Sequence, residues 1–300
     1  MRNYLLIVLL AFVVASCRKD GRDGETILKG TAKVLVDESI YPMVEDQVAV
    51  FETDYDAKIN LLARSEAEAI QAFFKDSAQI IILPRPLNDD ERKIFASRKM
   101  FPETAKIASD AVALIAHQSF KDSTVALADV VAFMKGARTS STIKGLVFDN
   151  PNSSTMRLLN ERATSTISEQ DDIYSFQTSE QVIEFIADNA GMIGIVGMNW
   201  LTQPSKESAT VLENVKILSV KDINGDRYIY PSQNNLAEGT YPLARDLYIV
   251  NAQGYSGLGV GFSTFIAGDR GQRIILKAGL LPVRMPSRQI NTRSKSENKK

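Results

Sequence analysis

Cysteine and histidine are almost missing from this sequence, and neither sign of charge is in excess. One Cys in 300 residues excludes an intramolecular disulfide and a cysteine-rich zinc or iron–sulfur site. One His excludes a metal site built from several histidines and argues against a histidine-based catalytic triad. Lys and Arg number 35 against 36 Asp and Glu, so the chain lacks the basic character of a nucleic-acid-binding protein. We therefore predict no metal, no cofactor and no nucleic-acid partner.

The sequence also has no apolar run of the length that a membrane-spanning helix needs, which is about 20 residues. Residues 5–14 form a shorter apolar run, which follows Arg2 and is followed by small residues directly before Cys17. This order is typical of a signal peptide. It also resembles a bacterial lipobox, in which signal peptidase cuts before a cysteine whose thiol carries diacylglycerol. We predict a lipoprotein signal peptide over residues 1–16 and lipidation of Cys17; the alternative is a plain secretory signal with a chance cysteine.

Lipidation of Cys17 would hold the mature chain at a membrane surface. The polar, Gly-containing residues 17–26 are then a flexible tether, and the polar, basic residues 291–300 are a disordered tail. These features predict a periplasmic or cell-envelope protein that is anchored to a membrane through lipid.

The rest of the chain alternates short apolar runs with segments of helical periodicity. The apolar runs are typical of buried parallel strands, and they occur at 33–37, 58–62, 78–83, 106–116, 191–197, 215–220 and 246–250. Apolar residues recur at helical spacing over 41–53, 65–75, 127–135, 154–163, 179–189 and 261–277. This alternation predicts an α/β fold with a mostly parallel sheet.

Hydroxyl groups stand at the starts of three of the predicted helices. Ser39 follows the first strand, Ser65 follows the second, and residues 150–157 (NPNSSTMR) follow a strand in the middle of the chain. The free N–H groups and the dipole of a helix N-terminus attract anions, and open α/β sheets bind ligands beyond the carboxyl ends of their strands. These positions suit an anion site, although such residues also serve simply as helix caps, as in the S-x-x-E capping box of Ser65 and Glu68.

Two arginines lie close to these turns. Arg85 follows a buried strand at the same sheet edge, and Arg157 is three positions into its helix. A guanidinium suits bidentate contact with a phosphate-like oxyanion, but each arginine could instead pair with a neighbouring carboxylate. The sequence has no Walker A loop, no G-x-S-x-G elbow and no carboxylate pair marked out for acid–base catalysis. We therefore predict that the chain is not an enzyme.

Seven segments in this order resemble the PstS-type phosphate-binding proteins, which are solute-binding subunits of ABC transporters. The resemblance covers about residues 30–290 and is strongest to the lipoprotein form found in Bacteroidota. The segments that carry it are 36–52 (VDESIYPMVEDQVAVFE), 65–91, 106–117 (KIASDAVALIAH), 147–157 (VFDNPNSSTMR), 191–200 (GMIGIVGMNW), 241–250 (YPLARDLYIV) and 261–282.

The resemblance implies a type II periplasmic binding protein fold. In this fold two α/β lobes, each a mixed and mostly parallel sheet flanked by helices, close by a hinge around a ligand in their cleft. It places lobe 1 over residues 27–115 and 225–290, and lobe 2 over 116–224. In the family, hydroxyls and backbone N–H groups at helix starts hold a dehydrated oxyanion with the help of an arginine. Carried over to this sequence, the ligand-binding residues are Ser39, Ser65, Arg85, Ser153, Ser154, Thr155 and Arg157.

This sequence departs from the family pattern in three places, one of which is a short region between Phe133 and Lys144 that lacks the usual Trp-containing loop of lobe 2. The usual Ser-Gly-Ser-Gly-Thr before the lobe 2 helix is here Asn-Pro-Asn-Ser-Ser-Thr. Well-known phosphate binders carry an Asp after the third strand, which accepts the proton of bound phosphate, but Pro84 stands there in this chain. Asp37, Glu38 or Asp149 could take over this acceptor role.

The resemblance implies a lipid-anchored solute-binding protein that captures phosphate or a similar oxyanion and delivers it to an ABC permease. A second hypothesis is a binding-fold lipoprotein with a degenerate cleft, acting as a sensor or adaptor in an envelope complex such as a TonB/ExbB-linked one. A phosphoesterase is the weakest hypothesis, because no nucleophile–base pair or metal cluster is evident.

Overall fold

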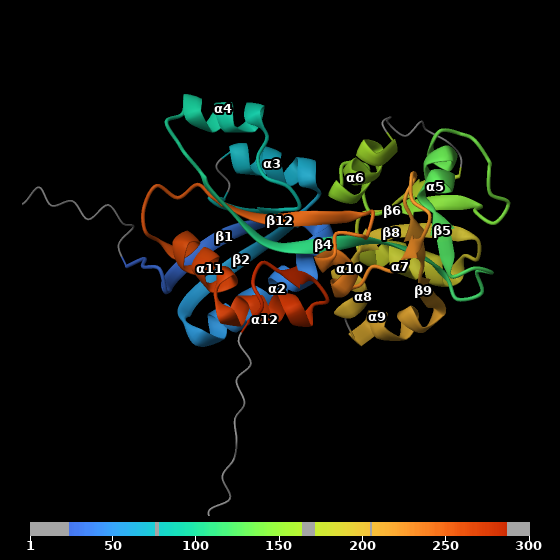
Figure 1. Ribbon diagram of the computed structural model, residues 1–300. Coiled ribbons are helices and arrows are strands. Elements are labelled where there is room, and N and C mark those ends of the chain that lie inside the picture. The colour runs from blue at the N-terminus through green and yellow to red at the C-terminus, as the bar shows by residue number, and fades with distance from the viewer. Residues whose placement is uncertain (1–23, 76–77, 164–171, 205, 287–300) are drawn as a thin grey trace, which may run out of the picture.

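The computed structural model describes residues 24–75, 78–163, 172–204 and 206–286, which form two lobes side by side (Figure 1). The predicted signal peptide, Cys17 and the tail at 291–300 lie outside the described residues. One continuous sheet runs through both lobes in the strand order β2-β1-β3-β12-β4-β8-β6-β7. Among the described residues, no helix is both long enough and apolar enough to cross a membrane.

The first lobe is built on three parallel strands. β1 (Lys29–Asp37) pairs in parallel with β2 (Asp56–Arg64) on one side and with β3 (Ile80–Leu83) on the other. Side chains alternate between the two sheet faces. Val34 and Val36 therefore pack under one set of helices, and Leu35 packs under another. The first set is α2 (Tyr41–Asp54), α11 (Leu258–Ala267) and α12 (Asp269–Lys277); the second is α3 (Glu66–Phe74) and α4 (Asp89–Ser97).

Two antiparallel strands connect the lobes. β12 (Ala244–Asn251) pairs with β3 on one side and with β4 (Glu103–His117) on the other. β4 is long enough to belong to both lobes, because its first half pairs with β12 and its second half pairs with β8 (Met192–Gly197). In Figure 1 both strands cross the middle of the molecule.

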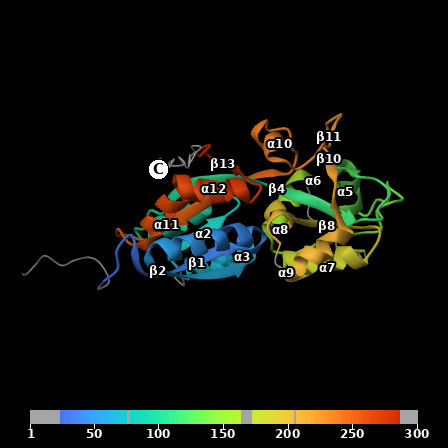
Figure 2. The ribbon, with the colours of Figure 1, turned by 90° about the horizontal axis from the view of Figure 1, so that it is seen from below.

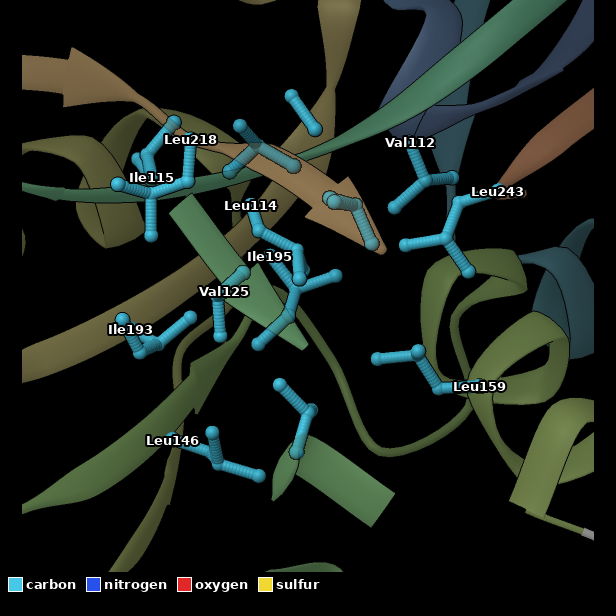
Figure 3. Packing of buried hydrophobic residues seen from close by; sticks show 14 of the residues in the cluster. Val112, Leu114, Ile115, Val125, Leu146, Leu159, Ile193, Ile195, Leu218 and Leu243 are labelled. Atoms are coloured by element: carbon cyan, nitrogen blue, oxygen red, sulfur yellow. The ribbon is translucent and has the colours of Figure 1, made fainter. Parts of the chain in front are cut away.

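The second lobe repeats the α/β pattern. β6 (Gly145–Phe148) is parallel to both β7 (Ile173–Ser175) and β8. Its apolar core joins residues of β4, β6 and β8 with helices around them (Figure 3). The helices are α5 (Leu127–Met134), α6 (Ser154–Ala163), α7 (Ser179–Asp188), α8 (Met198–Thr202) and α9 (Lys206–Val211).

Short elements complete the molecule. They are η1 (Glu38–Ile40), β5 (Thr124–Ala126), η2 (Leu212–Asn214), β9 (Val215–Ile217), β10 (Ser219–Lys221), β11 (Tyr228–Ile229), α10 (Gln233–Ala237) and β13 (Leu281–Pro282). Of these, α10, β10, β11 and β13 are seen in Figure 2, which views the molecule from below.

The predicted α/β fold is confirmed, with two corrections to single elements. The strand predicted over 215–220 is two strands, because β9 pairs with β4 whereas β10 pairs with β5. The helix predicted over 261–277 is broken at Gly268, whose backbone is extended (φ −77°, ψ 170°). Neither break changes the apolar pattern, so periodicity alone does not reveal it.

The buried apolar residues show where the chain passes from one lobe to the other, which is inside β4 and again close to β12. Buried apolar residues up to Ala108 and from Leu247 onward pack in the first lobe, and those from Ala111 to Leu243 pack in the second. The sequence predicts divisions after 115 and after 224. Residues 225–243 contribute Leu236 and Tyr241 to the core of the second lobe, while Gln233 donates to Leu276 O beside the first lobe. Both divisions stay predictions.

Candidate functional site

The starts of two helices face each other where the lobes meet. Ser39 lies in η1 directly after β1, and Ser154 is the first residue of α6, which follows β6. Their Oγ atoms are 3.1 Å apart, and both residues are fully buried. The structure therefore brings together two of the residues that the resemblance implies for anion binding, one from each lobe.

Arg245 of β12 lies behind these two hydroxyls. Its Nη1 donates to Ser154 Oγ at 2.8 Å and its Nη2 donates to Ser39 Oγ at 2.9 Å. On its other side, Nε and Nη2 donate to Asp110 Oδ2 at 3.0 and 2.8 Å. Sequence reasoning missed Arg245 and Asp110. Other charged residues lie in the same strands, Asp246 in β12 and Lys106 in β4, so charge alone did not single out this pair. Their adjacency depends on the β4–β12 register, in which the two residues are direct partners.

The carboxylate of Asp37 contacts the same two hydroxyls as Arg245. Its Oδ1 accepts hydrogen bonds from Ser39 N and Ser154 Oγ, each at 3.0 Å, and from Ser39 Oγ. Its Oδ2 is buried without a hydrogen-bond partner among the described atoms. Burial raises the pKa of Asp37 to about 6, although nearby Arg245 opposes the shift. A single carboxylate oxygen is thus held by donors from both lobes.

The remaining hydroxyls at the start of α6 serve their own lobe. Thr155 Oγ1 donates to Asp149 Oδ1 at 2.6 Å and is 2.9 Å from Ser153 Oγ. Ser153 Oγ also accepts from Met156 N at 3.2 Å, as a helix cap does. Asp149 is buried, and this burial raises the pKa of its carboxyl above its ordinary range, although hydrogen bonds from Ser153 and Thr155 oppose the shift. A ligand role for Ser153 and Thr155 stays a prediction.

Glu38 joins the first lobe to two helices of the second. Its Oε1 accepts from Ser179 N at 2.8 Å and its Oε2 accepts from Ser179 Oγ at 2.9 Å, at the first residue of α7. In α8, Trp200 Nε1 donates to Glu38 O at 3.2 Å, and Asn199 Nδ2 donates to Ser39 O at 2.8 Å. Burial raises the pKa of Glu38 to about 8, and the charge of Asp149 adds to the shift. The lobes are therefore in direct polar contact around η1.

Gly197, the last residue of β8, lets η1 come this close. A Cβ at this position would lie 2.2 Å from Ser39 O, a backbone atom that no side-chain rotation can move away. We expect Gly197→Ala to force the two lobes apart locally. Overpacking of this kind costs about 1–3 kcal/mol, so the melting temperature should fall by about 3–8 °C. Thermal denaturation followed by circular dichroism measures the effect.

Gly254→Ala is the matched control for this substitution, because a Cβ at Gly254 meets no atom within 4 Å. Its melting temperature should stay within about 1 °C of wild type, since substitutions away from such contacts change stability little. A Gly197→Ala protein as stable as Gly254→Ala would contradict the close contact between β8 and η1.

Ser65 lies at the start of α3 and is engaged by its own helix. Its Oγ donates to Glu68 Oε2 at 2.8 Å, and its N–H reaches the same oxygen at 3.3 Å. The predicted capping box is thus present. Ser65 makes no described contact with Ser39 or Ser154, and its role in ligand binding stays a prediction.

Arg85 and Arg157 meet at the carboxylate of Glu66, beside the hydroxyl pair rather than on it. Each donates from Nε to Glu66 Oε1 at 2.8 Å. Arg85 also forms a bidentate pair with Glu91, at 2.8 Å for both bonds, and Arg157 pairs with Glu161 at 2.7 Å. Both arginines therefore pair with neighbouring carboxylates, which is the alternative that the sequence leaves open. A cavity of about 500 Å³ lies beside this network, lined in part by Asn152 and Met156.

Known proteins share this architecture. Residues 23–270 match the family model of the PBP superfamily domain. The curated phosphate-binding protein PstS of Staphylococcus epidermidis is 25% identical over 243 residues, which cover 77% of this chain and 70% of the relative.

Two solved structures have the same fold at low sequence identity. One is a putative phosphate ABC transporter substrate-binding protein from Clostridium perfringens with bound phosphate; it has a TM-score of 0.69 and 18% identity, covering 85% of this chain and all of that one. The other is an ABC-type phosphate transport receptor from Vibrio cholerae, with a TM-score of 0.63 and 14% identity, covering 84% of this chain and all of that one. The predicted resemblance to PstS-type proteins and the type II fold are confirmed, and the chain belongs to the PBP superfamily.

Proposed function

We propose that this chain is a solute-binding protein that holds phosphate or a similar oxyanion between its lobes for an ABC transporter. The observation that carries the proposal is the convergence of Arg245 with the hydroxyls of Ser39 and Ser154 from facing lobes. Hydrogen bonds from a guanidinium and from hydroxyls at helix starts are the contacts that stabilise a dehydrated oxyanion. The names of the Staphylococcus epidermidis relative and of the two structural neighbours support phosphate as the ligand.

Anchoring and partnership belong to the same proposal. The charged, apolar and small residues that precede Cys17 support export and lipidation at that residue. A lipid anchor would keep the chain beside a permease in the membrane, where a captured anion can be passed on. The proposal includes no catalytic step.

Phosphate binding by the isolated protein tests the ligand assignment. We expect saturable binding of one phosphate per chain in equilibrium dialysis with labelled phosphate, measured at pH 5.5 and at pH 7.5. Ser154→Ala should weaken the affinity about threefold or more, because it removes a hydrogen bond to the bound anion. The same hydroxyl bonds Asp37 in the phosphate-free form, which offsets part of the loss.

Ser97→Ala is a suitable control, since Ser97 is exposed and, among the described residues, its Oγ donates to Ile94 O of its own helix. Its affinity should equal that of wild type. If wild type shows no saturable binding at either pH, phosphate is not the ligand, and the fold assignment is unaffected.

A further inference from the structure

The contacts of Asp37 Oδ1 are those expected of a bound anion. Three donors converge on this oxygen: Ser39 N, Ser39 Oγ and Ser154 Oγ. One of them, Ser154, belongs to the opposite lobe, and Arg245 supports both hydroxyls from behind. A carboxylate that receives several hydrogen bonds in a buried site is held in the same way as an external oxyanion. The chain therefore contains its own occupant for this site.

The two hydroxyls cannot serve Asp37 and an external oxyanion at once. Each serine hydroxyl has one proton to donate, and in this arrangement both protons point to Asp37 Oδ1. The hydroxyl oxygens are 3.1 Å apart and fully buried, so an oxyanion cannot lie between them unless the lobes separate. Binding of an external anion thus requires that the contact between Ser154 and Asp37 is broken.

The groups around Asp37 are mostly acidic. They are Glu66 of α3, Asp149 after β6 and Glu38 of η1, and the basic group is Arg245 of β12. Glu66 is paired with Arg85 and Arg157, and Arg245 is paired with Asp110 of β4. An additional anion with two charges would enter this buried region beside the Asp37 carboxylate at a cost that protonation of Asp37 would reduce.

We propose that Asp37 is an internal competitor for the oxyanion site, so that an external oxyanion binds only when it displaces the Asp37 carboxylate from Ser39 and Ser154. This inference rests on the proposed function, because it assigns Asp37 the control of affinity at that same site. The external oxyanion should bind weakly when Asp37 is ionised and more tightly when Asp37 is protonated. The raised pKa of about 6 means that Asp37 takes up its proton in the mildly acidic range. The unpartnered Oδ2 is the atom that can take up the proton.

Isothermal titration of phosphate into wild type and Asp37→Asn tests the proposal. The amide has the shape of the carboxyl group without its charge, so we expect Asp37→Asn to bind phosphate at least tenfold more tightly than wild type at pH 7.5. When the pH is lowered from 7.5 to 5, the dissociation constant of wild type should fall at least tenfold more than the dissociation constant of Asp37→Asn does. The variant also corrects for the titration of phosphate itself over this range.

Asp149→Asn is the matched control. It removes an equally buried carboxylate from the same region, but Asp149 accepts from Thr155 and not from Ser39 or Ser154. We expect a gain in affinity of less than threefold, because the site stays occupied by Asp37. Equal gains in the two variants would show that only the local charge matters, and would overturn the proposal. Asp37→Asn that binds phosphate as weakly as wild type, or more weakly, would overturn it as well.

A measurement without phosphate separates this inference from the proposed function. Asp37→Ala removes all the hydrogen bonds to Oδ1, so its phosphate-free form should be more open than wild type and have a larger radius of gyration in X-ray scattering. If no variant binds phosphate but Asp37→Ala opens, the ligand assignment fails and Asp37 still holds the lobes together. An unchanged radius of gyration in Asp37→Ala, with thermal denaturation confirming that it is folded, would overturn the internal-competitor role.

Discussion

Arg245→Met should lower the free energy of unfolding by about 3–5 kcal/mol, which is the usual cost of removing one partner from a buried ion pair. Arg245 and Asp110 are both buried, and the guanidinium donates twice to Asp110 Oδ2. Met fills much of the volume of the arginine side chain but leaves the Asp110 carboxylate without its cation. The same change removes the contacts from Arg245 to Ser39 and Ser154 that connect the lobes. Thermal denaturation should show a melting temperature far below that of wild type.

The double variant Arg245→Met, Asp110→Asn distinguishes this charge effect from a loss of packing. It leaves no buried charge at the β4–β12 pair, so most of the lost stability should return, as it does when a buried pair is replaced as a whole. Arg245→Lys keeps the charge but not the planar fork, and its stability should lie between wild type and Arg245→Met. A cost below about 1 kcal/mol for Arg245→Met, or no recovery in the double variant, would contradict the role of this pair.

Part of the candidate site can be predicted from sequence because it follows from local rules. Ser39 and Ser154 each lie at a strand-to-helix turn, and the carboxyl ends of strands gather at one sheet edge. The structure places these two hydroxyls 3.1 Å apart although 115 residues separate them along the chain. Arg245 could not be found in this way, because it lies within a strand and reaches Ser39 only through the order and register of β12.

Side-chain partners are the part that local pattern leaves open. Arg85 and Arg157 have the chemistry of anion ligands, but Glu66 lies between them and takes both guanidinium groups. The sequence suggests Asp37 as one possible proton acceptor for bound phosphate, whereas the structure shows its Oδ1 bonded to the two serine hydroxyls. Which partner a charged group takes depends on the three-dimensional arrangement of both lobes, and no spacing in the sequence records it.

The protein should become more stable as the pH falls from 8.5 to 5. Glu38 has a folded-state pKa of about 8, raised by burial and by Asp149, whereas its ordinary value is 4.5. Between these two values the folded state holds a proton that the unfolded state has lost, so stability decreases with rising pH by at most about 1.4 kcal/mol per pH unit. The raised pKa of Asp37 acts in the same direction up to about pH 6. We expect a total loss of about 2 kcal/mol or more by pH 8.5, seen as a decrease of about 5 °C in melting temperature.

Glu38→Gln isolates the contribution of this carboxyl. The amide oxygen can still accept from Ser179 N, which preserves a contact with the start of α7, but no charge forms at high pH. The variant should therefore be more stable than wild type at pH 8.5 and similar to it at pH 5. Glu184→Gln makes the same substitution at an exposed position of α7 and should keep the pH dependence of wild type. If the melting temperatures of wild type and Glu38→Gln fall equally between pH 5 and pH 8.5, the Glu38 carboxyl is not the group whose titration lowers the stability.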